Sequence, residues 1–258
     1  MTPTIAMALY NSFGPKTMFL SGAVMGTISF ILALFVKERY QRPKAVEKTT
    51  EKKRPGFRFG RGFALMILLP SLVNFFVLFG DSAVQSFLIP CGMSRGIGQI
   101  SLYFMVNQLV VIFTRLAVDR LIIRIPKRSC ILVGLLMAAV GTALIAAAYS
   151  LPMMLLSAVL LGLGYTAVTQ VLQAEVLLTS PVERRGVAGT TFMLLGNIGG
   201  MGTALWGRVS SGAGYGATYI LAGAATLLGC LFHGVYWRKR QEGGIGCKFT
   251  AKEAETAR

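Results

Sequence analysis

Long apolar stretches separated by mostly short connections are the feature that most constrains this chain. They cover residues 17–36, 63–88, 98–118, 129–149, 153–178, 187–206 and 216–237. A stretch of about 20 apolar residues crosses the bilayer core as a helix, which satisfies its own backbone hydrogen bonds in lipid. We therefore expect an all-α membrane protein with about seven complete transmembrane helices, preceded by a partial helix near the N-terminus.

The formal net charge of +16 raises nucleic acid as a partner, so the positions of the basic residues matter. All but three of the 26 Lys and Arg residues lie on alternate connections or in the C-terminal tail; the exceptions are Lys16, Arg95 and Arg208. Positive residues collect on the cytoplasmic side of membrane proteins. The pattern predicts a multi-pass protein of the cell membrane with a cytoplasmic C-terminus, in contact with the lipid bilayer and not with nucleic acid.

One connection, residues 37–62, is much longer than the others. It is highly charged, poor in large aliphatic residues and contains two prolines, as is typical of a solvated linker. We therefore divide the chain into residues 1–36, a remnant of a first helical bundle, the basic cytoplasmic linker 37–62, a six-helix bundle at 63–238 and a cytoplasmic tail at 239–258.

The connection that follows the third apolar stretch has a distinctive basic sequence, RLAVDRLIIRIPKR, at Arg115–Arg128. It resembles the loop between helices 8 and 9 of the major facilitator superfamily, with Asp119 and Arg120 at the acidic and basic positions. It differs from the family pattern at Arg115 and Ile122, where glycines are usual.

Other segments extend this resemblance. Residues 181–189 (PVERRGVAG) are similar to the family's loop into helix 11, and Gly214 with Tyr215 is similar to the entry into helix 12. At the start of the chain, Thr2, Pro3 and Ala6 resemble the helix 5 motif of efflux members. The resemblance implies a major-facilitator-type helical bundle, present from the end of helix 5 through helix 12, and is closest to bacterial drug and sugar efflux members.

The resemblance implies secondary active transport, with ion-coupled efflux of a small organic molecule and protons as the coupling ion. Such transport needs two helical bundles, so we expect either a truncated or partial carrier chain or one half of a split carrier, whose partner is a separate N-terminal half. The alternative is a non-transporting membrane fragment, or a helical scaffold that binds a partner protein. The sequence contains no Walker loop, HExxH motif or nucleophile elbow, so we expect no enzymatic activity, no cofactor and no metal site.

Polar residues inside the apolar stretches are the candidates for substrate contact, because such side chains are costly in lipid unless they line a cavity or pair within the protein. Helical geometry places Asn74, Asp81 and Gln85 on one face, which either lines a cavity or bonds to neighbouring helices. The other candidates for a cavity lining are Tyr103, Asn107, Gln170, Gln173 and Asn197.

Glu175 points away from the polar face of its own stretch and lies near the cytoplasmic end. There it comes within reach of Arg115, Arg120 or Arg184. We expect these residues, together with Asp119, to form an inner gate; the alternative is a carboxylate solvated at the membrane edge.

Small residues form one stripe along the sixth apolar stretch and its end: Gly189, Gly196, Gly200, Thr203 and Gly207. Such stripes let a neighbouring helix approach closely, so we expect a packing surface. A set of aromatic residues predicts the outer membrane boundary, namely Tyr149, Trp206, Tyr215 and Tyr219.

Overall fold

A computed structural model describes residues 3–35, 61–124, 126–180 and 184–241. Its elements are α1 (Pro3–Phe35), α2 (Arg61–Ser94), α3 (Ser101–Arg124), α4 (Lys127–Ala147), α5 (Leu151–Thr179), α6 (Arg185–Gly200) and α7 (Thr203–Gln241). The described residues form helices without strands, which confirms the all-α prediction. Most of the predicted linker 37–62 and tail 239–258 lies outside the described residues, as do the side chains of Asp119 and Arg120.

Five helical segments in the described ranges are long and apolar enough to cross a membrane. They are Gly14–Phe35, Ile67–Ser94, Lys127–Ala147, Leu151–Thr179 and Arg185–Arg238. The last covers 54 residues, enough for two crossings at about 20 residues each. The apolar part of α3, Ser101–Ala117, is shorter. The predicted apolar stretches therefore fall on these helices.

The chain divides into two compact units, Met1–Arg58 and Phe59–Arg258. Each unit contains a helical pair joined by a sharp break at a glycine. In α1 the break is at Gly14, with φ 81° and ψ 174°, and Pro15 follows it. In α7 it is at Gly214, with φ 82° and ψ 169°, and Tyr215 follows it. Glycine suits both positions because other residues are strained at positive φ.

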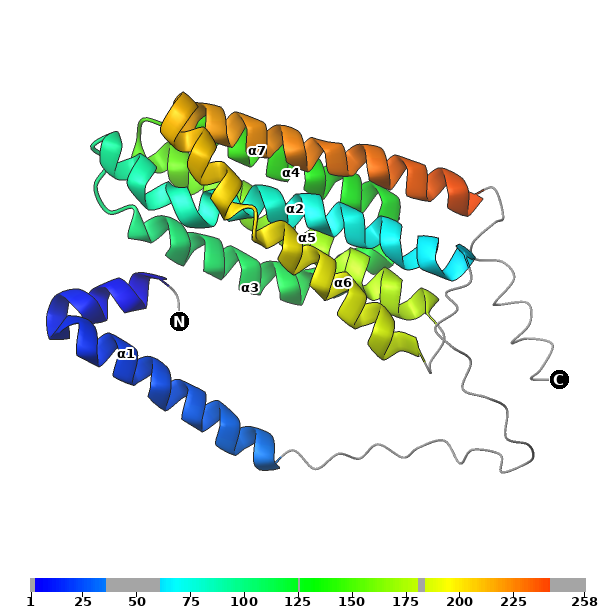
Figure 1. The fold of residues 1–258 in the computed structure, drawn as a ribbon, viewed down its shortest axis with the longest axis horizontal. Coiled ribbons are helices and arrows are strands. Elements are labelled where there is room, and N and C mark those ends of the chain that lie inside the picture. Colours follow the sequence, from blue (N-terminus) through cyan, green and yellow to red (C-terminus); the bar gives the residue numbers. More distant parts are fainter. Residues whose placement is uncertain (1–2, 36–60, 125, 181–183, 242–258) are drawn as a thin grey trace. The chain divides into compact units, whose positions relative to one another are not determined.

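The second unit is a bundle in which α2 packs against α5, α6 and α7, while α4 lies against α5 and α7 and α3 lies against α5 (Figure 1). Its interior is apolar: Val73, Val77 and Leu88 of α2 are buried with Leu135 of α4 and Leu161 of α5. Large apolar side chains also cover the outside of the helices, as expected where lipid or a second bundle replaces water. On α3 they are Met105, Leu109, Ile112, Phe113 and Leu116.

Arg95 ties the end of α2 to the end of α4. Its guanidinium donates hydrogen bonds to the carbonyl oxygens of Ile145 at 2.7 Å, Ala146 at 2.9 Å and Ala148 at 2.5 Å. It also lies 5.1 Å from the ring centroid of Tyr149. The last carbonyls of a helix have no partners within the helix and carry partial negative charge, so a cation there satisfies them.

Glycines bring the backbones of α2 and α6 close together. A Cβ atom at Gly199 would lie 2.3 Å from the carbonyl oxygen of Phe75, and one at Gly196 would lie 2.3 Å from Nδ2 of Asn74. Gly202, after α6, is in similarly close contact with the ring of Phe79. The predicted packing surface is therefore present, but it includes Gly199 and Gly202, which were not part of the predicted stripe. A Cβ at Gly200, which the stripe included, would meet nothing within 4 Å.

Candidate functional site

A pocket of about 240 Å³ lies between α2 and the junction of α6 with α7. Leu78 is the one large apolar side chain in its lining, although the helices around it are strongly apolar. The remaining lining residues are polar or glycine: Asp81, Ser82, Gln85, Ser86, Gly196, Asn197, Gly200 and Thr203. A hollow with this composition inside apolar helices is a site where a polar molecule can be bound.

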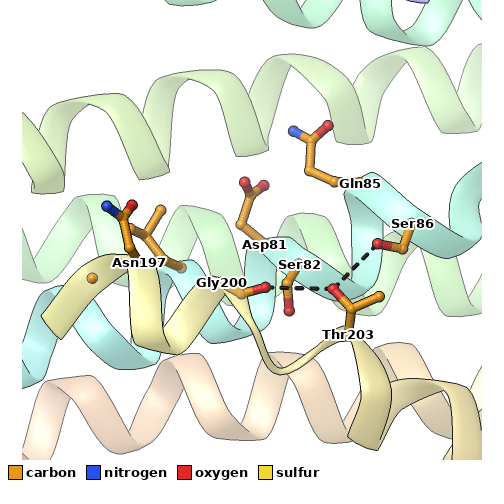
Figure 2. Close-up of a pocket in the computed structure, with 9 residues that line it drawn as sticks. Asp81, Ser82, Gln85, Ser86, Asn197, Gly200 and Thr203 are labelled. Atoms are coloured by element: carbon orange, nitrogen blue, oxygen red, sulfur yellow. Dashed lines mark hydrogen bonds between the residues drawn. The ribbon is translucent and has the colours of Figure 1, made fainter. Parts of the chain in front are cut away.

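Two of the predicted residues reach the pocket from consecutive turns of α2. Asp81 and Gln85 project to the same side of the helix (Figure 2), as the four-residue spacing requires. The Gln85 side chain also interacts with the Asp81 carboxylate. The pocket thus has an acidic group and an amide side by side on one wall.

The opposite wall is formed where the helix is interrupted. Helix α6 ends at Gly200, a short turn at residues 201–202 follows, and α7 begins at Thr203. The turn is closed by backbone hydrogen bonds from Met201 to Asn197, 3.1 Å, and from Gly202 to Gly199, 3.0 Å. Interrupted helices in transporters free backbone and side-chain polar groups at the substrate site. Here the interruption places Asn197 and Thr203 on the same pocket.

The hydroxyl groups of the lining are already engaged with the protein. Ser86 donates to Oγ1 of Thr203 at 3.4 Å, and Thr203 donates to the carbonyl oxygen of Gly200 at the same distance (Figure 2). Ser82 donates to the carbonyl oxygen of Phe79 at 2.7 Å. The bond from Ser86 to Thr203 joins the two walls, and all three bonds set the direction in which the hydroxyls point.

The amide of Asn197 and the carboxylate of Asp81 make fewer contacts with the protein than these hydroxyls do. Within the described ranges, Asn197 makes no hydrogen bond through its side chain and Asp81 has no ion-pair partner. Both side chains face the pocket (Figure 2). A ligand can therefore form hydrogen bonds with one wall and meet a negative charge on the other.

The structure gives the other predicted lining residues different positions. Asn74 is buried against Gly196, one turn below the pocket, and its Oδ1 has no hydrogen-bond partner among the described residues. Tyr103 is buried in the core. Asn107 donates a hydrogen bond of 3.0 Å to the carbonyl oxygen of Ala158 and so links α3 to α5. Gln170 and Gln173 are half-buried on α5 and do not line the pocket.

At the other end of these helices, Glu175 is buried and paired. Lys127 Nζ lies 2.9 Å from Glu175 Oε2. Helix α4 begins directly after Pro126, and this places Lys127 at its first position. This partner is not among the arginines that we expected. Arg115 and Arg184 are exposed, at the end of the apolar part of α3 and directly before α6.

Sequence reasoning missed several lining residues. Ser82 and Ser86 directly follow Asp81 and Gln85 on α2, and the same spacing could have indicated them. Lys127 could have been considered as a partner because it is a basic residue at a helix start. The turn at residues 201–202 had a weaker signal, the glycines that surround Met201.

Comparison with known proteins agrees with this architecture. The family model described as Major Facilitator Superfamily matches residues 71–253, which include the whole pocket and five of the six helices of the bundle in full. No curated protein matches the chain.

Proposed function

Because the chain belongs to the major facilitator superfamily, whose members are membrane transporters, we propose that it exports small organic molecules in exchange for a coupling ion. The observation that carries this proposal is the polar pocket between α2 and the α6–α7 interruption. Asp81 is the ionisable group of that pocket, which makes it the candidate for proton coupling. Substrate contacts are assigned to Gln85, Asn197 and Thr203.

Alternating access in this superfamily requires a second bundle, and two features support one here. The described residues of unit Phe59–Arg258 form one six-helix bundle with apolar side chains on its outside. The break at Gly14 repeats the backbone geometry of the break at Gly214. We infer that α1 corresponds to the last helical pair of a first bundle, and that a partner bundle, on this chain or on another, completes the transporter.

The pair of Glu175 and Lys127 is the candidate for the inner gate. This assignment puts the start of α4 and the end of α5 at the cytoplasmic face, in agreement with the basic residues at those helix ends. The test introduces a cysteine into the pocket and measures how fast a membrane-impermeant thiol reagent, added on the cytoplasmic side, labels it. Glu175→Gln should raise the labelling rate, whereas an unchanged rate would remove Glu175 from the gate.

Transport itself is testable without knowing the natural substrate. Membrane vesicles that contain the full chain, with and without a co-expressed first bundle, are loaded with cationic, neutral or anionic fluorescent dyes under an imposed pH gradient. We expect dye movement that an ionophore abolishes and that Asn197→Ala reduces. Thr142→Val, a buried change in α4 outside the pocket lining, is the matched control. Dye movement equal to that of empty vesicles in both preparations would favour the non-transporting scaffold.

A further inference from the structure

We propose that the pocket binds the protonated amine of its substrate, and that an ammonium group bearing N–H donors pairs there with Asp81. The inference rests on the proposed function, because it names the class of molecule bound at the same site. It starts from the observation that, in the described part of the bundle, no basic side chain pairs with Asp81.

A carboxylate inside a membrane span is costly unless a cation or several donors compensate it. Lys127 pairs with Glu175, and Arg95 is engaged by three carbonyl oxygens. The other described basic side chains of the bundle lie near helix ends, away from the pocket lining: Arg115, Arg128, Arg184, Arg185, Arg208 and Arg238. In the described ranges no protein cation reaches Asp81, so the ligand is the natural source of one.

The size of the pocket favours a head group rather than a whole molecule. Sites for drug-sized ligands enclose roughly 300–1,000 Å³, and this pocket measures about 240 Å³. It fits the polar end of a molecule whose remainder lies outside the pocket.

The lining also distinguishes between kinds of ammonium group. Quaternary ammonium ligands are typically bound on aromatic faces, and the lining contains no aromatic residue. It offers acceptor oxygens instead, on Asp81, Gln85, Asn197 and Thr203. Each N–H of a primary ammonium can donate to such an oxygen, whereas a trimethylated nitrogen has no donor. A primary ammonium should therefore bind more tightly than its trimethylated form.

The same carboxylate can be neutralised by a proton, which supplies a mechanism of exchange. The titratable groups close enough to Asp81 to interact with it electrostatically are the buried phenols of Tyr103 on α3 and Tyr165 on α5. On α7, Tyr219 interacts with Cys91 and Tyr103 instead, and the described residues of α6 at the pocket are uncharged. Since phenols remain neutral near pH 7, Asp81 is the group whose charge changes. Proton and ammonium then exclude one another.

The test measures equilibrium binding of three matched probes to the full chain in lipid nanodiscs. They are 2-phenylethylammonium, its N,N,N-trimethyl form and the uncharged 2-phenylethanol. We expect the primary ammonium to bind most tightly, with affinity that falls as the medium is acidified. Asp81→Asn should weaken its binding by about tenfold or more, without changing the binding of 2-phenylethanol. Thr142→Val should bind all three as the wild type does.

Other results would overturn the inference. If 2-phenylethanol binds as tightly as the ammonium and Asn197→Ala weakens both, the pocket remains a small-molecule site, so the proposed function stands without the charge. If the trimethyl form binds best, the N–H donors are not what the site recognises. If no probe binds the wild type, the ammonium class is excluded, and the dye experiment decides the proposed function separately. The ranking of the three probes on the wild type does not depend on the folding of Asp81→Asn.

Discussion

The indole Nε1 of Trp206 donates a hydrogen bond of 2.8 Å to the carbonyl oxygen of Phe79, and the same N–H lies 3.1 Å from Oγ of Ser82. Trp206 belongs to the first turn of α7, and Phe79 and Ser82 lie on α2. The rings of Trp206 and Phe79 are also in contact, with centroids 4.7 Å apart. This side chain therefore fixes the start of α7 against the wall that carries Asp81.

Replacing Trp206 separates the two contributions of its ring. Trp206→Phe removes the N–H donor and keeps an aromatic ring, so we expect a loss of about 1 kcal/mol in the free energy of unfolding. Trp206→Ala also removes the packing and should cost roughly 3–5 kcal/mol. Reversible denaturation of the detergent-solubilised protein measures both. Equal losses for the two variants would mean that packing around the ring contributes little.

Neighbouring glycines of α6 should respond in opposite ways to the same substitution. In Gly199→Ala the new methyl group meets the carbonyl oxygen of Phe75, and relieving this overlap should cost roughly 1–3 kcal/mol. In Gly200→Ala the methyl group enters open space, and alanine favours helix by up to about 1 kcal/mol. Thermal unfolding in detergent should show a lower midpoint for the first variant only. A lower midpoint for Gly200→Ala alone would contradict the packing described here.

Because Arg95 caps the end of α4, replacing it should lower the stability of the protein by an amount that depends on the new side chain. Arg95→Met leaves three carbonyl oxygens without their donor, and hydrogen bonds to charged groups contribute roughly 1.5–3 kcal/mol each at most. Arg95→Lys keeps the charge, but an ammonium cannot reproduce the planar arrangement of donors. We expect the stability order wild type, Arg95→Lys, Arg95→Met in denaturation experiments. Identical stability of the lysine and wild-type proteins would show that charge alone is sufficient.

A double-mutant cycle tests the ion pair of Lys127 with Glu175. Removing one member of a fully buried pair typically costs about 3–5 kcal/mol, and removing both costs less. Here Glu175 is buried but the Lys127 side chain is 35% exposed, so solvent screening should make the cost of Lys127→Met smaller than that. We therefore expect Lys127→Met to destabilise the protein more than Lys127→Met combined with Glu175→Gln. The coupling free energy comes from the unfolding free energies of the four proteins. Additive effects would place the pair in water, in contrast to the buried carboxylate seen here.

Much of this fold follows from hydropathy alone, because a bilayer requires long apolar helices. The spacing of Asp81 and Gln85 was also sufficient to predict a shared face, and Asn197 was identified as a polar residue within a span. Hydropathy does not report backbone interruptions, however. The predicted apolar stretch 187–206 therefore did not indicate the turn at residues 201–202, which separates α6 from α7.

The sequence also did not predict which side chains contact one another across neighbouring helices. Trp206 and Tyr219 were assigned to the outer aromatic belt, but they are only 4% and 0% exposed. Trp206 is buried because its N–H finds acceptors on α2, and such a contact depends on how two helices are rotated against each other. The pairing of Glu175 with Lys127 depends on the same rotation, which apolar periodicity specifies only coarsely.

At Gly196 and Gly199, α2 and α6 are in direct contact, without intervening side chains that would let the two helices slide past each other. The two walls of the pocket are therefore expected to move together, as one rigid body, in every conformational state. A ligand would not enter by parting them. It would reach Asp81 and Asn197 when the partner bundle moves away from them and the proposed gate at Glu175 and Lys127 is open, while the groups that recognise the ligand remain fixed on this bundle.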